Sequence, residues 1–178
     1  MKTKKLSLCA MLIAINVVLS LLAPIKLANF KFTFEAFPIL IASLMYGPIE
    51  GLIVGSIGSA IYQILFSGYG LMLTTPLWIL PHAISGLVVG IYSKKYSFVL
   101  NNKQMIFINI LNSFLVTSLN TVAIYLDAKI FGYYTFVYVF GNIIFKIISG
   151  VLLAIIYSII LPKLINRVKK LYYWVFNT

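Results

Sequence analysis

Long stretches without a charged side chain are the feature that most constrains this sequence. Residues 6–25, 51–93 and 104–126 contain no Asp, Glu, Lys or Arg. A membrane-spanning helix needs about 20 mostly apolar residues, so each stretch is long enough for one or two such helices. Hydrophobic residues make up 62% of the chain and charged residues 10%, whereas soluble domains carry about 25% charged residues. The sequence therefore excludes a soluble globule and predicts an integral membrane protein.

We predict an all-α membrane protein with one domain, residues 1–178, in which a compact bundle of six helices crosses the bilayer. The helices are expected at about residues 5–23, 36–46, 49–66, 77–92, 104–126 and 135–161. The second helix is too short to span the bilayer alone. The first could be mistaken for a signal peptide, but no persuasive small-residue cleavage site follows it, so we expect an uncleaved helix.

The basic residues predict how the bundle is oriented. The formal net charge is +11, a balance that in a soluble protein would suggest nucleic-acid binding. Most of the cations instead fall on one side of a six-helix bundle: Lys2, Lys4, Lys5, Lys94, Lys95, Lys103, Lys163, Arg167, Lys169 and Lys170. The other side would hold Lys26, Lys31 and Lys129. The positive-inside rule then places both termini in the cytoplasm, and we expect no nucleic-acid partner.

Small residues recur every fourth position around the predicted third helix. Gly47, Gly51, Gly55 and Ser59 form this stripe. Small side chains allow the backbones of two membrane helices to approach closely, so we expect a tight helix contact here. A phosphate-binding loop is a poor alternative, because the chain has no GxxxxGK[ST] pattern.

Lys146 is the one Lys or Arg predicted to lie inside the membrane. It is expected well within the sixth helix, where even a lenient insertion scale assigns Lys a penalty of about 2.5–3.5 kcal/mol. Tyr138, Asn142 and Lys146 recur every four residues and so share one helix face. We predict that this face binds a polar or anionic ligand that enters from outside. The alternative is that Lys146 snorkels to the interface or pairs with a neighbouring carbonyl.

Further polar and aromatic residues are expected at the same depth. The fifth helix has too many polar residues for a lipid-facing helix, with Asn120 at about the depth of Asn142. The third and fourth helices contribute further candidates: Tyr62, Gln63, Trp78 and His82. Aromatic rings beside amide groups suit a flat heterocycle. The alternative for each is structural, as an interfacial aromatic or a satisfied buried His.

The segment before the second helix has the alternation of a strand. Phe30, Phe32 and Phe34 alternate with Lys31, Thr33 and Glu35, which indicates a short strand or an extended lid. We include Phe34 and Glu35 among the candidate ligand-binding residues, on the hypothesis that this segment covers the site. An interfacial anchor is the alternative.

The residues do not favour catalysis or metal binding. The three acids, Glu35, Glu50 and Asp127, belong to different loops or helix ends, so a carboxylate pair for acid–base chemistry is not expected. One His and one Cys cannot form a metal site of the usual kind. We predict no metal and no cofactor, and active transport by this chain would need energy from outside.

Two sequence blocks resemble a known family. Ala10 and Ala14 in CAMLIA are similar to the AxxxA motif of the substrate-binding S components of energy-coupling factor (ECF) vitamin transporters. The segment FEAFPILIASLMYGPIEGLIVGSIGSAIYQIL resembles the region from the first loop to the third helix in the folate branch of that family. The chain length and the predicted six helices are similar over nearly the whole chain.

The resemblance implies a multi-pass protein of a bacterial cell membrane that is not an enzyme. It implies a vitamin site near the outer face, with folate or a related pterin first and thiamine, pantothenate or a pyrimidine precursor as other possibilities. It further implies that Ala10 and Ala14 dock on a coupling transmembrane subunit that two separate ATPases drive, as in an ABC-type importer. The alternative function is an intramembrane enzyme or a membrane assembly factor.

Overall fold

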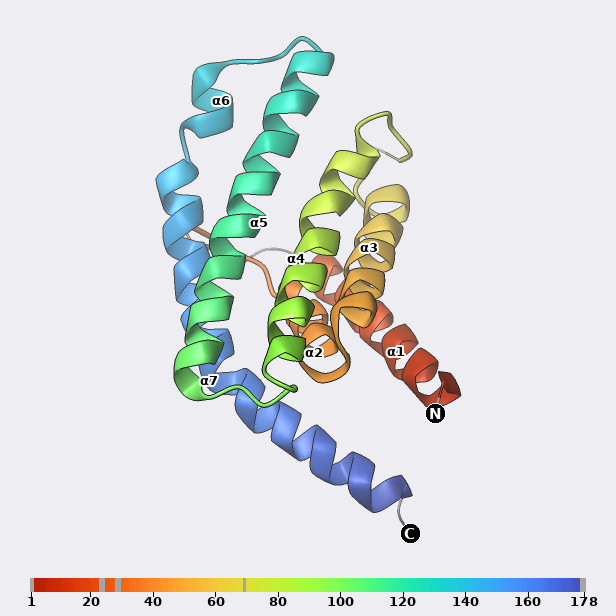
Figure 1. Cartoon of the computed structure of the whole chain (residues 1–178). Helices are drawn as coiled ribbons and strands as arrows, with labels where there is room; N and C mark the ends of the chain where they lie inside the picture. The colour runs from red at the N-terminus through yellow and green to blue at the C-terminus, as the bar shows by residue number, and fades with distance from the viewer. Residues whose placement is uncertain (1, 23–24, 28–29, 69, 177–178) are drawn as a thin grey trace.

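The computed structural model describes residues 2–22, 25–27, 30–68 and 70–176. Its helices are α1 (Lys2–Leu21), α2 (Ala36–Tyr46), α3 (Pro48–Leu65), α4 (Thr75–Lys95), α5 (Asn102–Ile130), α6 (Phe136–Phe140) and α7 (Ile143–Phe176). A short antiparallel hairpin, β1 (Ile25–Leu27) and β2 (Phe30–Phe32), connects α1 to α2. Figure 1 shows α5 and α7 side by side in one part of the molecule and α1 to α4 in the other. The prediction of a compact helical bundle is confirmed.

Four helical segments are long and apolar enough to cross a membrane, counted over the described residues. They are Pro48–Leu65, Thr75–Lys95, Asn102–Ile130 and Phe136–Val168. The apolar part of α1, Lys5–Leu21, and the whole of α2 are shorter. The first turn of α1 and the last turn of α7 lie at the same end of the bundle (Figure 1). The side of the membrane on which they lie stays a prediction.

The predicted helix over 135–161 is wrong in two respects. It is split into α6 and α7 at Gly141 and Asn142, because Gly lowers helix propensity and Asn is a favoured residue at a helix start. The Asn142 carbonyl accepts a 3.0 Å hydrogen bond from the Lys146 N–H as α7 begins. Pro162 does not end the helix, since α7 continues to Phe176; Figure 1 shows α7 changing direction in its lower part.

The period-two prediction for the segment before α2 is confirmed in part. Phe30–Phe32 form β2, whose residues pair with β1 so that Ile25 faces Phe32 and Leu27 faces Phe30. Phe34 lies beyond the strand, in the short link to α2. The hairpin therefore ends immediately before the residues that reach into the bundle.

The α3 and α4 helices meet through glycine, as the small-residue stripe predicts. A Cβ on Gly51 or on Gly86 would overlap the backbone of the other helix at its partner glycine. The same is true of Gly55 against the His82 backbone. These helices thus touch backbone to backbone, which fixes α4 and the side chains that it presents on its other faces.

The short helix α2 is enclosed by its neighbours. Ile39, Leu40 and Ala42 are at most 1% exposed, and α2 packs on α1, α3, α4 and α7. Ser43 donates to the Gly86 carbonyl oxygen at 2.9 Å, and its hydroxyl also lies 2.7 Å from the Ile39 carbonyl oxygen. Because its apolar residues face protein and its Ser43 is satisfied, an 11-residue helix is stable here without spanning the bilayer.

Candidate functional site

A cavity of about 860 Å³ lies between the α5–α7 side of the bundle and α3, α4 and the link before α2. Sites for drug-sized ligands measure about 300–1,000 Å³, so one small organic molecule fits. Tyr138, Asn142 and Lys146, which the sequence predicts to share one helix face, line this cavity. The break between α6 and α7 falls between Tyr138 and Lys146. The break leaves the three side chains on the same wall.

Most of the other predicted ligand-binding residues line the same cavity from different elements. The structure places Tyr62 and Gln63 on α3, Trp78 and His82 on α4, Asn120 on α5 and Glu35 in the link before α2. Phe34 is not among the lining residues, and 37% of its surface is exposed. The candidate residues therefore converge, apart from Phe34.

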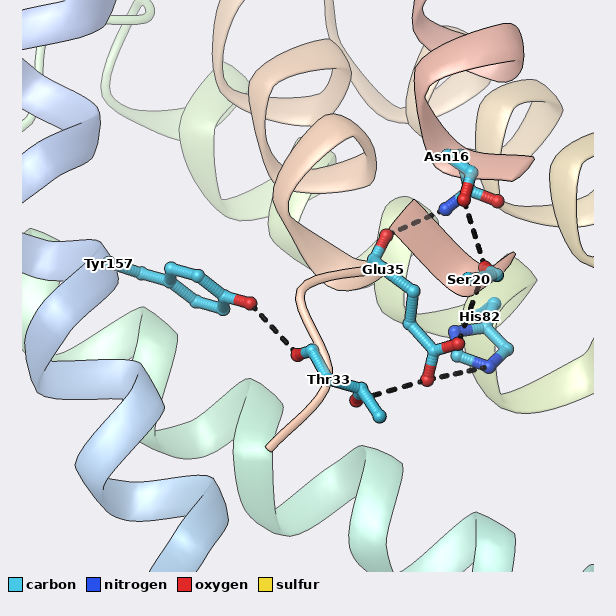
Figure 2. A network of polar contacts seen from close by, with 6 residues as sticks. All are labelled: Asn16, Ser20, Thr33, Glu35, His82 and Tyr157. Atoms are coloured by element: carbon cyan, nitrogen blue, oxygen red, sulfur yellow. Dashed lines mark hydrogen bonds and ion pairs between the residues drawn. The ribbon is translucent and has the colours of Figure 1, made fainter. Parts of the chain in front are cut away.

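Glu35 is held by side chains from two helices, α1 and α4 (Figure 2). From α1, Asn16 donates to the Glu35 carbonyl oxygen at 2.6 Å, and the Ser20 hydroxyl lies 2.9 Å from the Asn16 carbonyl oxygen and 3.4 Å from the Glu35 carboxylate. From α4, Nε2 of His82 lies 4.0 Å from Oε1 of Glu35, a distance at which a protonated imidazole forms an ion pair. The carboxylate thus connects the cavity wall to both α1 and α4.

The link before α2 is tied to the far wall as well. The Tyr157 hydroxyl on α7 donates to the Thr33 carbonyl oxygen at 3.2 Å, while the Thr33 hydroxyl donates to Glu35 at 3.3 Å. Figure 2 shows the Tyr157 ring reaching across to Thr33 from the opposite side to Asn16. One short segment therefore bridges the two parts of the bundle, next to the cavity.

Acidic and phenolic groups line the cavity near the start of α6. Tyr133 donates a hydrogen bond to the Asp127 carboxylate, and both residues line the cavity. That hydrogen bond to Asp127, followed by burial of the hydroxyl, raises the pKa of Tyr133 above its usual value. The phenol is therefore a neutral donor at physiological pH.

Sequence reasoning missed several lining residues on α5 and α7. Asn109, Asn112, Asp127 and Tyr157 all line the cavity. The signal for the first two was present, because Asn109 and Asn112 lie on the same polar face of the predicted fifth helix as Asn120. Asp127 is expected in a loop or at a helix end, and Tyr157 falls within the predicted helix over 135–161 without being singled out.

The two candidate docking residues lie apart from the cavity. Ala10 and Ala14 are both exposed on α1, beside exposed Met11 and Ile15.

In the described part of the chain no group of three or more His, Cys, Asp or Glu residues is placed to hold a metal ion.

A model of the family described as the ECF-type riboflavin transporter S component matches residues 1–167. The match and the membrane-spanning helices define the class: an integral, multi-pass membrane protein that is a transporter subunit and not an enzyme. The chain belongs to the family of ECF-type riboflavin transporter S components. The sequence-based assignment to S components is confirmed, its folate branch is not, and the alternatives of an enzyme or assembly factor are not retained.

Solved structures with the same fold are S components. One, described as the S component of a bacterial ECF transporter, superposes with a TM-score of 0.67 at 24% identity, covering 95% of this chain and 99% of that one. Another, described as the S component for biotin from an ECF-type ABC transporter, gives a TM-score of 0.58 at 17% identity over 88% and 90% of the two chains.

Curated relatives match over a shorter region. UPF0397 proteins of Streptococcus pneumoniae are 49% identical over 59 residues in strain Hungary19A-6, and 48% identical over 60 residues in serotype 19F strain G54. These alignments cover 33% and 34% of this chain, and 30% of each relative. The chain thus aligns with less than a third of the length of these relatives.

Proposed function

We propose that this chain captures a flat heterocyclic vitamin in the described cavity, and that riboflavin is the leading candidate. The observation that carries the proposal is the convergence of aromatic, amide and hydroxyl groups from α3, α4, α5 and α7 on one 860 Å³ cavity. Aromatic side chains stack on a planar ring, and amides and hydroxyls bind its polar edge and a polyhydroxylated chain. The family description supports the same ligand.

The charges of the cavity favour an uncharged ligand. Its lining contains two carboxylates, Glu35 and Asp127, against one ammonium group, Lys146. Riboflavin carries no net charge at neutral pH, whereas folate carries two carboxylates that would meet a lining with a surplus of acid. Folate or a related pterin is therefore the second candidate, and the observation in its favour is the position of Lys146 on the cavity wall.

We assign the residues roles by their chemistry. Trp78, Tyr62 and Tyr138 supply aromatic faces for the heterocycle. Lys146 supplies a charged donor to a carbonyl oxygen of the ligand, and hydrogen bonds to charged groups are stronger than neutral ones. Other polar contacts come from Gln63, Asn120 and Asn142, with His82 and Glu35 on the side of the link before α2.

Transport requires partners, and we propose that α1 supplies the docking surface. Ala10 and Ala14 are exposed and small, so a partner helix can approach the α1 backbone closely. The partners implied by the resemblance are a coupling transmembrane subunit and two ATPases, with the vitamin site facing the outside of the cell.

Titration of the purified protein with riboflavin and with folate, without ATP, tests the proposal. Quenching of flavin fluorescence should report binding at about 1 μM or tighter, equivalent to about −8 kcal/mol. Folate should bind more weakly. Binding of folate and not of riboflavin would make folate the ligand of the site. Absence of binding to any water-soluble vitamin would contradict the proposed function.

A further inference from the structure

Two asparagines on α5 form one end of the cavity. Asn109 and Asn112 line it and are 2% and 4% exposed. They lie three residues apart and so share one helix face. Neither side-chain oxygen accepts a hydrogen bond from any described residue. A buried acceptor without a donor is unfavourable, so these oxygens call for an explanation.

Hydrogen bonds on α7 fix the orientation of the Asn109 amide. Ser158 donates its only hydroxyl proton to the Ala154 carbonyl oxygen, at 2.7 Å. Its oxygen must therefore accept the contact with Asn109, which comes from Nδ2 at 2.9 Å. An amide turned the other way would place two acceptors together. The amide orientation is therefore fixed, and Oδ1 of Asn109 is an acceptor that receives no hydrogen bond from the described protein.

The opposite helix leaves space at this level. A Cβ on Gly150 of α7 would meet the Ser113 hydroxyl of α5, so the absence of a side chain at Gly150 leaves room for Ser113. Gly150 and Ala154 line the cavity there with little or no side chain. This end of the cavity therefore combines small residues on α7 with the unpaired side-chain oxygens of Asn109 and Asn112 on α5.

We propose that Asn109 and Asn112 form a subsite that accepts hydrogen bonds from donor groups of the ligand. We call this subsite the acceptor floor. This inference rests on the proposed function and adds to it a chemical requirement. The ligand group that reaches the acceptor floor carries O–H or N–H, and a group with acceptors alone is rejected because it leaves the two oxygens unpaired.

Two parts of riboflavin carry such donors. The ribityl chain has hydroxyl groups, and the ring has one imide N–H. Lumiflavin lacks the ribityl hydroxyls but keeps the imide, whereas 3-methylriboflavin lacks the imide N–H but keeps the hydroxyls. A comparison of both analogues with riboflavin therefore distinguishes which end of the ligand contacts the acceptor floor.

The experiment measures the affinities of the three flavins for the wild type and for Asn112→Leu, which removes the acceptor and keeps the branched shape of the side chain. The wild type should bind one analogue at least about tenfold more weakly than riboflavin. In Asn112→Leu the affinity for riboflavin should fall by at least about tenfold. The analogue that the wild type binds weakly should then bind to this variant as tightly as riboflavin does. Asn112→Ala serves as a second variant if the leucine does not fit.

The matched control is Ser118→Leu, a polar-to-leucine change at an exposed position of α5 that does not line the cavity. It should leave all three affinities within about twofold. Unchanged discrimination between riboflavin and its analogues in both Asn112 variants would overturn the acceptor floor and would indicate that water satisfies these oxygens. Absence of riboflavin binding to the wild type would instead overturn the proposed ligand, and this inference with it.

Discussion

The α3–α4 pair and the α5–α7 pair are built from membrane helices of similar composition but pack in different ways. Gly51 and Gly86 bring α3 and α4 into backbone contact, with no room for even one added methyl group. Between α5 and α7, Gly150 lies close to the Ser113 hydroxyl, and a cavity that both helices line opens beside this contact. The first pair is held together by backbone contact, and both pairs present polar and aromatic side chains to the cavity.

The difference follows from where each pair places its polar groups. In α4, the buried Ser85 hydroxyl has no partner among the described residues but does not line the cavity, while the Ser93 hydroxyl donates to the Leu44 carbonyl oxygen at 3.0 Å and is satisfied by the protein. In α5, the side-chain oxygens of Asn109 and Asn112 are not. Buried polar groups that their own fold satisfies stabilise it, whereas those left unsatisfied are available to a ligand.

The sharpest test of this division is at α1, which packs with the rigid part. Ala14→Trp should reduce vitamin uptake by cells by more than about tenfold while binding by the purified protein stays within about twofold, because a large side chain blocks close helix approach. Uptake of labelled riboflavin and titration of the purified protein measure the two effects. Val122→Trp, at a 52% exposed position on α5, is the control and should change neither. Equal loss of binding and uptake in Ala14→Trp would remove the docking assignment.

Within the α5–α7 pair, Lys146 should matter for binding. Lys146→Ala should weaken ligand binding by about 1.5–3 kcal/mol, a factor of about 10 to 150, if the ammonium group donates to the ligand. Titration of the purified variant measures the change. Lys129→Ala is a suitable control, since Lys129 packs over the Tyr134 ring 4.5 Å away and is not a lining residue. Unchanged affinity in Lys146→Ala would return this lysine to a structural role.

Adding one methyl group should affect stability differently in the two helix pairs. Gly86→Ala should lower the free energy of unfolding by about 1–3 kcal/mol, because its Cβ meets the Gly51 backbone, which cannot rotate away. Gly150→Ala should be nearly neutral or slightly stabilising, since the one tight contact of its Cβ is with the Ser113 hydroxyl, which can rotate, and Ala is a better helix former than Gly. Thermal unfolding of the purified variants gives the comparison. Equal losses in the two variants would show that the pairs are packed alike.

The smallest effect is expected where the two parts are bridged. Tyr157→Phe removes the hydrogen bond to the Thr33 carbonyl oxygen and should lower stability by about 0.5–1.5 kcal/mol. Hydrogen exchange at the amides of residues 33–35 should become faster, while exchange within α3 and α4 should not change. Faster exchange throughout the bundle would mean that the bridge supports the whole fold.

The sequence predicts the helices well, because membrane helices are long apolar runs with identifiable breaks. The bounds of α2 agree with the structure, and the glycine stripe predicts the α3–α4 contact. The split at Gly141 was missed because apolar residues continue on both sides of it, and hydropathy does not register a single-turn interruption. The continuation of α7 through Pro162 was missed because proline more often ends a helix than bends it.

The site was predicted less completely than the fold. Lys146, Asn142 and Tyr138 could be placed on one wall because their spacing matches the helical repeat. Phe34 could not be separated from Glu35, because the direction of a side chain in an irregular link depends on contacts such as Asn16 to the Glu35 carbonyl oxygen. Those contacts join residues that are distant in the sequence and leave no local pattern.

The backbone contact between Gly51 and Gly86 has a consequence for sequence change over time. Any side chain at either position would force α3 and α4 apart, so substitutions there should be lost whatever the ligand is. The cavity walls on α5 and α7 have no such constraint at most positions. A new ligand preference could therefore arise through substitutions on those two helices, while the remainder of the bundle keeps its shape and its docking surface.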